Sequence, residues 1–319
     1  MTAVPAHQAW QVRGLYVTHL ELVVCEELSA GVLLEKLVGS KAMTQRVFAR
    51  GQLTRGRDVL QRGSVLLPGD VLTLAFTRGG EEPASRLSGK PLEVVYQDPI
   101  LLAIDKPAGL LVHGDGTGSV TLTDCVRAML AKEGRSCLPQ AIQRLDVETT
   151  GLVLFSLVPE LQPRLDAQVA GYDMHKRYLA VIAGRLKASE DRWLELRGPI
   201  ARDRHDARKM RVAAKGKPSL TRVQTLAYQK GRSLLLVELG SGRKHQIRVH
   251  LAHAGHPLLG DALYGGAHHK DGLMLHAWKE NLVHPATGER LSLRTAWPQR
   301  FDSLFPDTGY DPGPRPLTS

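Results

Sequence analysis

The sequence predicts a protein of two domains in which helices and strands alternate. Its 319 residues exceed the length of one average domain and leave ample chain for a large core. Residues 78–91 are rich in Gly, Pro, Glu and Ser, which is typical of a flexible linker, and they separate a short first unit from a longer second one. Strand-like and helix-like runs alternate in the second unit, so strand counting alone leaves both α/β and α+β folds open.

The first unit, residues 13–77, is predicted to contain two short helices and at least one strand. Capping patterns predict the helices over residues 29–37 and 40–49. A Pro-Gly-Asp turn precedes a strand that is expected over residues 71–76. Six basic residues and one acid lie within residues 41–62, so the unit either presents a basic binding face or is a structural cap whose charges are solvated.

The second unit, residues 92–304, is predicted to begin with two strands. These strands are expected over residues 92–96 and 101–105, and a helix over residues 122–132. Further strands are expected as far as about residue 239. Residues 305–319 are rich in Pro, Gly and Asp, a composition that predicts a disordered tail.

An aspartate in a polar turn between two apolar runs is the first candidate for chemistry. Asp146 lies within Gln143–Gly151, between a run that ends at Ile142 and a second run over residues 152–158. A loop carboxylate at the start of a buried strand is held rigidly yet remains reachable by substrate, as a nucleophile must be. The alternative is a turn aspartate that only bonds nearby backbone, because Asp before Thr-Thr-Gly is a common turn.

Two further segments carry a tyrosine and an arginine in suggestive surroundings. Residues 176–184 are predicted to form a strand with Tyr178, Ala180 and Ile182 on one face. Residues 242–251 are predicted to form a helix that Ser241 caps and Gly255 ends, with Gln246 and His250 on one side and Arg248 on another. Taken singly, such a tyrosine is usually a core residue and such an arginine a solvated cation.

In their chain order, these three segments resemble the RluA-type pseudouridine synthase family. The family pattern is His-Arg-Leu-Asp-x-x-Thr-Ser-Gly, then Lys-x-Tyr, then Gly-Arg-x-His-Gln-Ile-Arg-Val-His. Two supporting segments, residues 104–113 and 255–265, extend the resemblance over roughly residues 92 to 300. The chain departs from the pattern at Gln143, where the family usually has His, and at Thr150, where it usually has Ser and where the hydroxyl is kept.

The resemblance implies an α+β fold, with a mixed, largely antiparallel sheet in a pseudouridine synthase-like catalytic domain. It also implies that the first unit is a small N-terminal α/β domain similar to the S-four-like RNA-binding module. The implied activity is isomerisation of specific uridines in structured RNA, which needs neither a cofactor nor a metal. The implied catalytic residues are Asp146, Tyr178 and Arg248, and the residues expected to contact RNA are Arg144, Thr149, Lys176 and Gln246.

The resemblance makes Asp146 the essential carboxylate but leaves its step open. The carboxylate either traps the anomeric carbon, as in retaining glycosidases, or removes a sugar proton, or attacks the uracil ring. Arg248 is the expected partner that keeps Asp146 ionised, and Tyr178 is expected to stack on the extruded base. The motifs do not name the RNA, for which ribosomal RNA is expected over transfer RNA.

The net charge of +10 predicts an anionic partner, although charge alone does not separate RNA from DNA or an acidic membrane. Residues 201–217 hold seven Lys or Arg against two Asp, which indicates an RNA-facing loop or a solvated hairpin. The three cysteines are far apart and argue against a disulfide framework. The sequence suggests no signal peptide or membrane span, so we expect a cytoplasmic monomer without a membrane or an obligate protein partner.

Two other functions compete with the isomerase. One is a metal-dependent hydrolase, suggested by several histidines that lack a complete ligand motif: His245, His250, His253, His256, His268 and His269. The other is a non-catalytic RNA-binding protein on the same scaffold, which would have no need for the carboxylate of Asp146.

Overall fold

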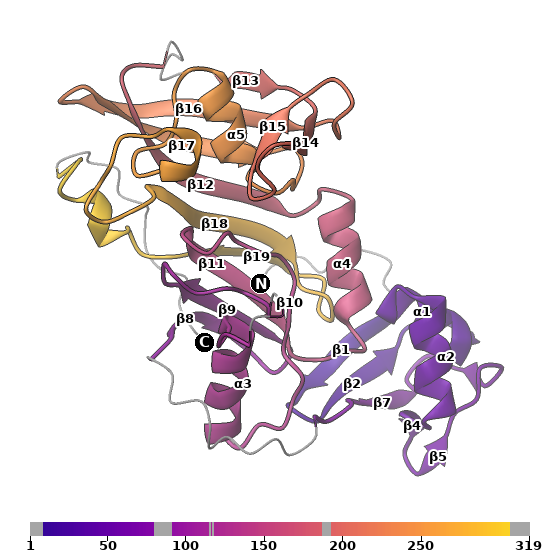
Figure 1. Cartoon of the computed structure of the whole chain (residues 1–319). Helices are drawn as coiled ribbons and strands as arrows, with labels where there is room; N and C mark the ends of the chain where they lie inside the picture. Colours follow the sequence, from indigo (N-terminus) through magenta and orange to yellow (C-terminus); the bar gives the residue numbers. More distant parts are fainter. Residues whose placement is uncertain (1–8, 80–90, 115, 117, 187–192, 307–319) are drawn as a thin grey trace.

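The computed structural model describes residues 9–79, 91–114, 116, 118–186 and 193–306. Within these residues two sheets dominate the molecule, one in the first unit and a larger one in the second (Figure 1). Most of the predicted linker at 78–91 and most of the predicted tail at 305–319 lie outside the described residues.

The first unit is built on a five-stranded antiparallel sheet. The strands follow the order β1 (Trp10–Leu15), β2 (His19–Val24), β7 (Val71–Ala75), β4 (Leu53–Arg55) and β5 (Asp58–Val59). A two-stranded ribbon joins β3 (Leu28–Ser29) to β6 (Val65–Leu66). Alternate residues of β2 and β7 are buried, which gives the sheet one apolar face, and the predicted strand at residues 71–76 is confirmed.

Two helices cover the apolar face of that sheet. Helix α1 (Ala30–Val38) and helix α2 (Lys41–Ala49) begin after Ser29 and Ser40, whose hydroxyls accept hydrogen bonds from backbone N–H groups of the first turn. Gly39 ends α1 in the left-handed conformation, which a residue without Cβ adopts freely. Both predicted helices are therefore confirmed within one residue.

The second unit is built on a ten-stranded sheet. Its main path runs through β13 (Leu194–Arg197), β16 (Leu220–Gln229), β17 (Arg232–Leu239), β12 (His175–Ala183), β18 (Leu275–Val283), β11 (Thr150–Ser156), β9 (Leu101–Lys106) and β8 (Glu93–Gln97). Two short strands lie off this path, β10 (Gln140–Ala141) beside β11 and β19 (Arg290–Arg294) beside β18. Neighbours among these described strands are antiparallel, except that β11 runs parallel to β18. The expected mixed, largely antiparallel α+β fold is confirmed.

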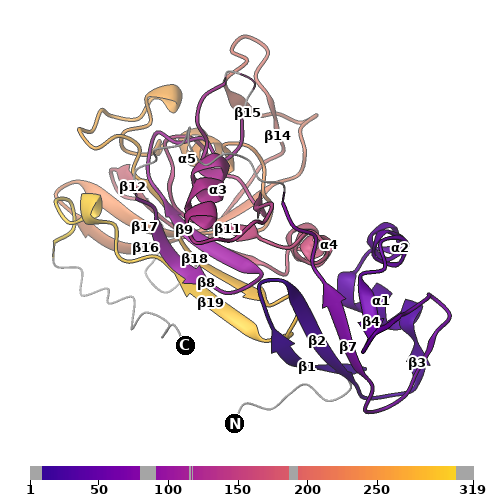
Figure 2. The same cartoon turned by 90° about the horizontal axis from the view of Figure 1, so that it is seen from below.

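Two helices cover one face of this sheet. Helix α3 (Leu122–Lys132), at the bounds that the sequence predicts, and helix α5 (Gln246–His253) lie on one face, as Figure 2 shows. The same face carries a small hairpin of β14 (Ile200–Arg202) and β15 (Met210–Val212), so residues 201–217 do contain a hairpin. Short helical turns follow α5 at η2 (Ala262–Tyr264) and near the chain end at η3 (Gln299–Phe301).

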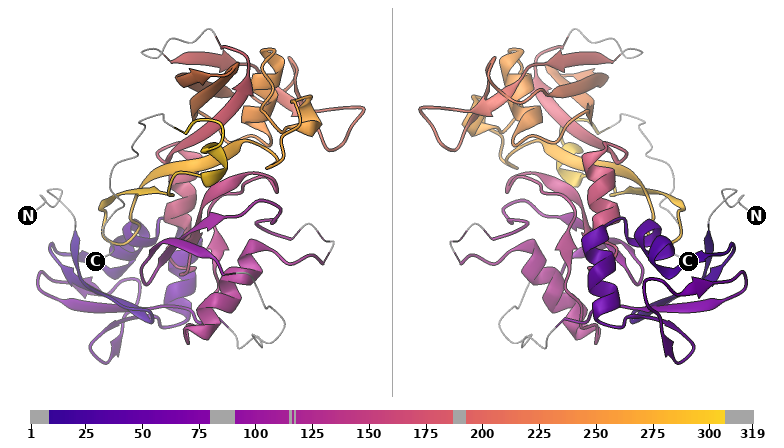
Figure 3. Two further views of the ribbon diagram at one scale, coloured as in Figure 1. Left: turned by 90° about the vertical axis from the view of Figure 1, so that its left-hand side faces the viewer. Right: turned by 90° about the vertical axis from the view of Figure 1, so that its right-hand side faces the viewer.

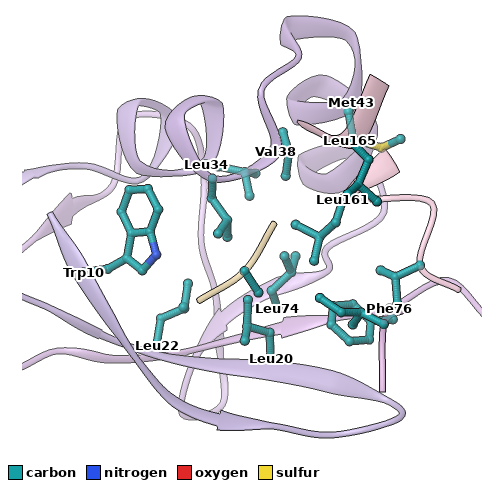
Figure 4. Close-up of a cluster of buried hydrophobic side chains, with 14 of the residues drawn as sticks. Trp10, Leu20, Leu22, Leu34, Val38, Met43, Leu74, Phe76, Leu161 and Leu165 are labelled. Carbon is teal, nitrogen blue, oxygen red and sulfur yellow. The ribbon is translucent and has the colours of Figure 1, made fainter. Parts of the chain in front are cut away.

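The first unit packs beside the β9 and β11 half of the large sheet, away from the half that contains β16 and β17 (Figure 3). Helix α4 (Gln162–Ala170) lies between the first unit and the large sheet. Leu161 and Leu165 insert beside Leu34 and Met43 of the first unit in one buried cluster (Figure 4). The two units therefore share a continuous apolar core.

Candidate active site

The loop that carries Asp146 spans the join between the two halves of the large sheet. Leu145 packs against the buried cluster under α3 and also against the cluster under α5, which fixes the loop on that face of the sheet. Gly151 ends the loop at a φ of 110°, and a Cβ at this position would collide with the backbone of Ala277 in β18. The Asp146 side chain is 25% exposed, so it is held firmly but remains accessible.

A buried lysine fastens the loop from below. Lys106 ends β9, and its ammonium donates hydrogen bonds to the carbonyls of Pro107 (2.9 Å), Leu110 (2.9 Å) and Val147 (3.0 Å). Burial lowers the pKa of Lys106 to about 8, while the charge of Asp146 opposes that shift. The three carbonyls come from two different loops, so Lys106 holds the Asp146 loop against the loop that follows β9.

Arg248 reaches the aspartate from α5. Its Nη1 lies 3.3 Å from Oδ2 of Asp146, while Nε and Nη2 bind the two carboxylate oxygens of Asp261 at 2.8 and 2.7 Å. The Arg248 side chain is only 3% exposed and Asp261 is fully buried. Burial alone would lower the pKa of Arg248, but the hydrogen bonds and charge of Asp261, together with the charge of Asp146, raise it. The guanidinium therefore presents a fixed positive charge to Asp146.

Glu148 shares this guanidinium from the exposed side. Its Oε2 lies 3.3 Å from Nη2 of Arg248, and its side chain is 54% exposed. Glu148 therefore lies against Arg248 rather than only in solvent. Arg144 is exposed, and its charge contributes, after burial, to lowering the pKa of His113 across the loop.

The start of α5 differs from the sequence prediction. The helix begins at Gln246 rather than near Gly242, and Ser241 does not cap it. The Ser241 hydroxyl instead donates to Oε1 of Gln246, which also accepts from the backbone of Arg243. These side-chain bonds compete with helix formation across the intervening residues. The predicted helix end is confirmed, because Gly255 follows α5 at a φ of 83°.

Gln246 is consequently engaged inside the protein. Its amide nitrogen donates to the carbonyl of Leu220 (2.8 Å) and to Oγ1 of Thr221 (3.1 Å), and the side chain is buried. The predicted contact of Gln246 with RNA is at odds with this position. Thr149, at the foot of the Asp146 loop, is buried as well. A polar side chain in this loop therefore does not always lie on the protein surface.

Tyr178 lies on β12, which confirms the predicted strand, and is paired with Val237 of β17 and Ala277 of β18. Its ring packs in the cluster under α5 with Ala180 and Ile182, on the face that carries Asp146. Burial, followed by the charges of Glu280 and Asp146, raises the pKa of Tyr178. Tyr178 is therefore a neutral phenol close to the aspartate.

A second buried carboxylate lies on the same face of the sheet. Glu280 of β18 is paired in register with Lys176, whose Nζ lies 3.7 Å from Oε1, and it accepts a hydrogen bond of 2.6 Å from Nε2 of Gln143. Burial raises the pKa of Glu280 to about 7, and Lys176 and Gln143 oppose that shift. Gln143, the residue that departs from the family pattern, thus anchors the first end of the Asp146 loop to β18.

The other departure keeps its hydroxyl in use. Thr150 contacts Nδ1 of His276 (2.7 Å) and accepts a hydrogen bond of 2.6 Å from Nη2 of Arg300. A serine would offer the same oxygen, so the substitution preserves the polar contact behind the loop.

Two charged groups near the site escaped the sequence reasoning, and a third was considered only as a metal ligand. Asp261 binds Arg248, and Lys106 holds the Asp146 loop through the carbonyl of Val147. Nε2 of His245, the third, is 3.7 Å from Oδ1 of Asp146. Lys106 and Asp261 occur within the two supporting segments of the resemblance, which was the available signal.

The histidine-rich stretch does not gather into a metal-binding cluster in the described parts of the chain, where no group of three or more His, Cys, Asp or Glu is placed to hold an ion. His250, for example, contacts Oγ1 of Thr221 (2.9 Å) and the carbonyl of Gly198 (3.0 Å).

None of the helices described in the structure is both long and apolar enough to cross a membrane.

Comparison with known proteins connects this geometry to one family. Residues 100–253 match the family model for RNA pseudouridylate synthase. Ribosomal large subunit pseudouridine synthase D of Xanthomonas campestris pv. campestris is 32% identical over 274 residues, which cover 80% of this chain and 78% of that protein. The uncharacterized RNA pseudouridine synthase YhcT of Bacillus subtilis is 29% identical over 293 residues, covering 89% of this chain and 96% of that protein.

Two solved structures resemble this chain as well. Human RNA pseudouridylate synthase domain containing 4 is 25% identical, with a TM-score of 0.52 over 66% of this chain and 90% of that one. Human RNA pseudouridylate synthase domain containing 1 is 23% identical, with a TM-score of 0.55 over 72% of this chain and 99% of that one, and shows the shared fold.

Proposed function

This chain belongs to the RluA-type RNA pseudouridine synthases, and on that premise we propose that Asp146 is the essential carboxylate of its uridine isomerisation. The reaction breaks the bond between N1 of uracil and the ribose, turns the base, and joins the ribose to carbon 5. Carbon 5 loses a proton and N1 gains one, so the overall composition is unchanged.

The contact between Arg248 and Asp146 carries this proposal. Every step considered for Asp146 uses a negatively charged carboxylate, and a fixed guanidinium lies 3.3 Å from it as the opposite charge. Arg248 is itself held by both oxygens of Asp261, so its charge is in place before substrate arrives. A buried arginine directed at a partly exposed carboxylate is costly as mere scaffolding, whereas a catalytic carboxylate needs it.

The target uridine must leave its stack to reach Asp146, at a cost of roughly a few kcal/mol. We assign Tyr178 to stack on the extruded base, which restores on the order of 1–3 kcal/mol. Arg144, exposed beside the aspartate in the same loop, is assigned to the RNA left behind, either in the gap or on a phosphate. Lys176 is assigned to RNA on the same face of the sheet, next to Glu280.

Ribosomal RNA is the proposed substrate, and transfer RNA is the alternative. The proposal rests on relatives named as ribosomal large subunit pseudouridine synthases, including that of Pseudomonas aeruginosa, which is 31% identical over 272 residues. Mapping pseudouridines in total RNA with and without the gene tests it. Loss of a ribosomal site is expected, and loss confined to transfer RNA would overturn this assignment while leaving the chemistry intact.

Two matched variants test the role of Asp146. Asp146→Asn keeps the size of the side chain but removes its charge, and we expect a loss of more than roughly a thousandfold in turnover with RNA binding retained. Glu148→Gln removes the other exposed carboxylate on the same arginine and should change turnover by less than about threefold. The measurement is release of tritium from carbon 5 of labelled uridine in RNA. A folded Asp146→Asn protein with normal turnover would refute the proposal.

A further inference from the structure

His245 approaches a different carboxylate oxygen of Asp146 from the one that Arg248 contacts. Its Nε2 is 3.7 Å from Oδ1 of Asp146, while Arg248 addresses Oδ2 at 3.3 Å. The His245 side chain is only 9% exposed. The two carboxylate oxygens of Asp146 are therefore addressed by two different groups, which come from positions three residues apart at the start of α5.

The other nitrogen of the imidazole contacts a tyrosine. Nδ1 of His245 lies 2.9 Å from the hydroxyl oxygen of Tyr264, which follows α5 in the turn η2. That hydroxyl oxygen also accepts a hydrogen bond of 2.8 Å from the backbone N–H of Met210 in β15. Because the oxygen accepts from Met210, its own proton is free to be donated to Nδ1 of His245.

This contact bears on the tautomer of the imidazole. When Nδ1 accepts a hydrogen bond from the hydroxyl of Tyr264, the ring proton of a neutral histidine lies on Nε2. Burial lowers the pKa of His245, with Arg248 and Lys244 acting in the same direction and Asp146 and Asp261 opposing them. In that tautomer the neutral ring presents an N–H donor to Oδ1 of Asp146.

The backbone of His245 supports a role for its side chain. The residue has a φ of 56°, in the left-handed region that few residues other than glycine adopt. His245 also has no capping hydrogen bond from its side chain to α5, so helix capping does not explain the imidazole. Strained residues of this kind gather at functional sites, where the surrounding structure holds them in place.

We propose that His245 is a positioning residue that holds Oδ1 of Asp146 through its Nε2–H, and that Tyr264 fixes the tautomer which makes this possible. The separation of 3.7 Å exceeds a hydrogen bond, and such contacts often shorten only when substrate is bound. Through Met210, the same chain of contacts reaches the basic hairpin of β14 and β15. The inference rests on the proposed role of Asp146.

Two amide substitutions separate positioning from simple packing. The amide nitrogen of His245→Gln reaches about as far as Nε2 of histidine, whereas that of His245→Asn lies nearer the position of Nδ1. We expect His245→Asn to lower kcat by roughly 10- to 100-fold with KM for RNA changed less than about threefold, and His245→Gln to recover a large part of kcat. Tyr264→Phe should lower kcat by about tenfold or less, because either tautomer is then populated.

His253→Asn, at the exposed end of the same helix, is the matched control and should behave like the wild type. Thermal unfolding of each variant verifies that the fold is intact. If Asp146→Asn is inactive but His245→Asn keeps wild-type kcat, this inference is overturned and the role of Asp146 stands. An active Asp146→Asn would instead remove the proposed function itself. Equal losses in His245→Asn and His245→Gln would mean that packing, rather than the Nε2 donor, is what matters.

Discussion

Replacing Arg248 with methionine removes the cation that binds both Asp261 and Asp146. The fully buried Asp261 carboxylate would keep a hydrogen bond of 3.2 Å from the backbone N–H of Tyr264, but no counter-charge. A buried ion pair broken on one side costs about 3–5 kcal/mol, because the remaining charge is uncompensated. We therefore expect Arg248→Met to lower the free energy of unfolding by about 4 kcal/mol.

The second substitution, Asp261→Asn, removes the stranded charge. In the Arg248→Met background it should return at least about 2 kcal/mol, because a neutral amide is far less costly to bury than an unpaired carboxylate. Alone, Asp261→Asn should cost less than Arg248→Met, because Arg248 would retain Asp146 and Glu148. The four proteins form a double-mutant cycle whose coupling energy is expected to exceed about 1.5 kcal/mol.

Urea unfolding at constant pH measures the stabilities, and tritium release from labelled RNA measures turnover on the same preparations. The double variant should be more stable than Arg248→Met yet equally inactive, because Asp146 lacks its cation in both. A double variant no more stable than Arg248→Met would show that the stranded carboxylate is not the source of the cost. Recovery of activity in the double variant would show that Asp146 does not need the guanidinium.

Three further outcomes follow from the same geometry. Tyr178→Phe should retain most turnover if the ring only stacks on the base, and a loss above roughly a hundredfold in the tritium assay would assign the hydroxyl to proton transfer. Burial raises the pKa of Glu280 from 4.5 to about 7, so between these values the folded state holds a proton that the unfolded state has released. The free energy of unfolding should therefore fall by up to about 3 kcal/mol as pH rises through this window. Glu280→Gln should lose this part of the pH dependence. Urea unfolding between about pH 5 and pH 8 measures it, and the same pH dependence in both proteins would contradict the assignment. Binding of RNA should weaken steeply with salt. In a plot of the logarithm of the binding constant against the logarithm of the salt concentration, Arg204→Ala in the basic hairpin should make the slope shallower by roughly one unit. Identical slopes for Arg204→Ala and the wild type would remove Arg204 from the RNA contacts.

Local signals were enough to predict the helices that carry their own caps. Ser29 and Ser40 cap α1 and α2, and a Thr121–Asp124 capping box begins α3, so their bounds are written in adjacent residues. The sheet type was not predictable in this way, because strand order depends on pairings far apart in sequence. The parallel pairing of β11 with β18 joins Thr150 to His276, and no local pattern specifies it.

The candidate site was predictable in part for the same reason. Asp146, Tyr178 and Arg248 were found through motifs, and the structure brings them to one face of the sheet. Gln246 was expected to contact RNA because of the family motif, and the motif carries no sign that hydrogen bonds to β16 hold this side chain inside the protein. His245 was considered only as a metal ligand, because its contact with Tyr264, nineteen positions away, is one that no spacing rule reveals.

The apolar cluster shared by the first unit and α4 makes the stability of each unit depend on the other. Leu161 and Leu165 would face water if the first unit came away, and so would Leu34 and Met43 on its side. Detachment is thus opposed by the hydrophobic effect at every step. Heating should unfold the two units in a single cooperative transition. A chain cut between the units should expose these apolar side chains and aggregate rather than give two separately folded units.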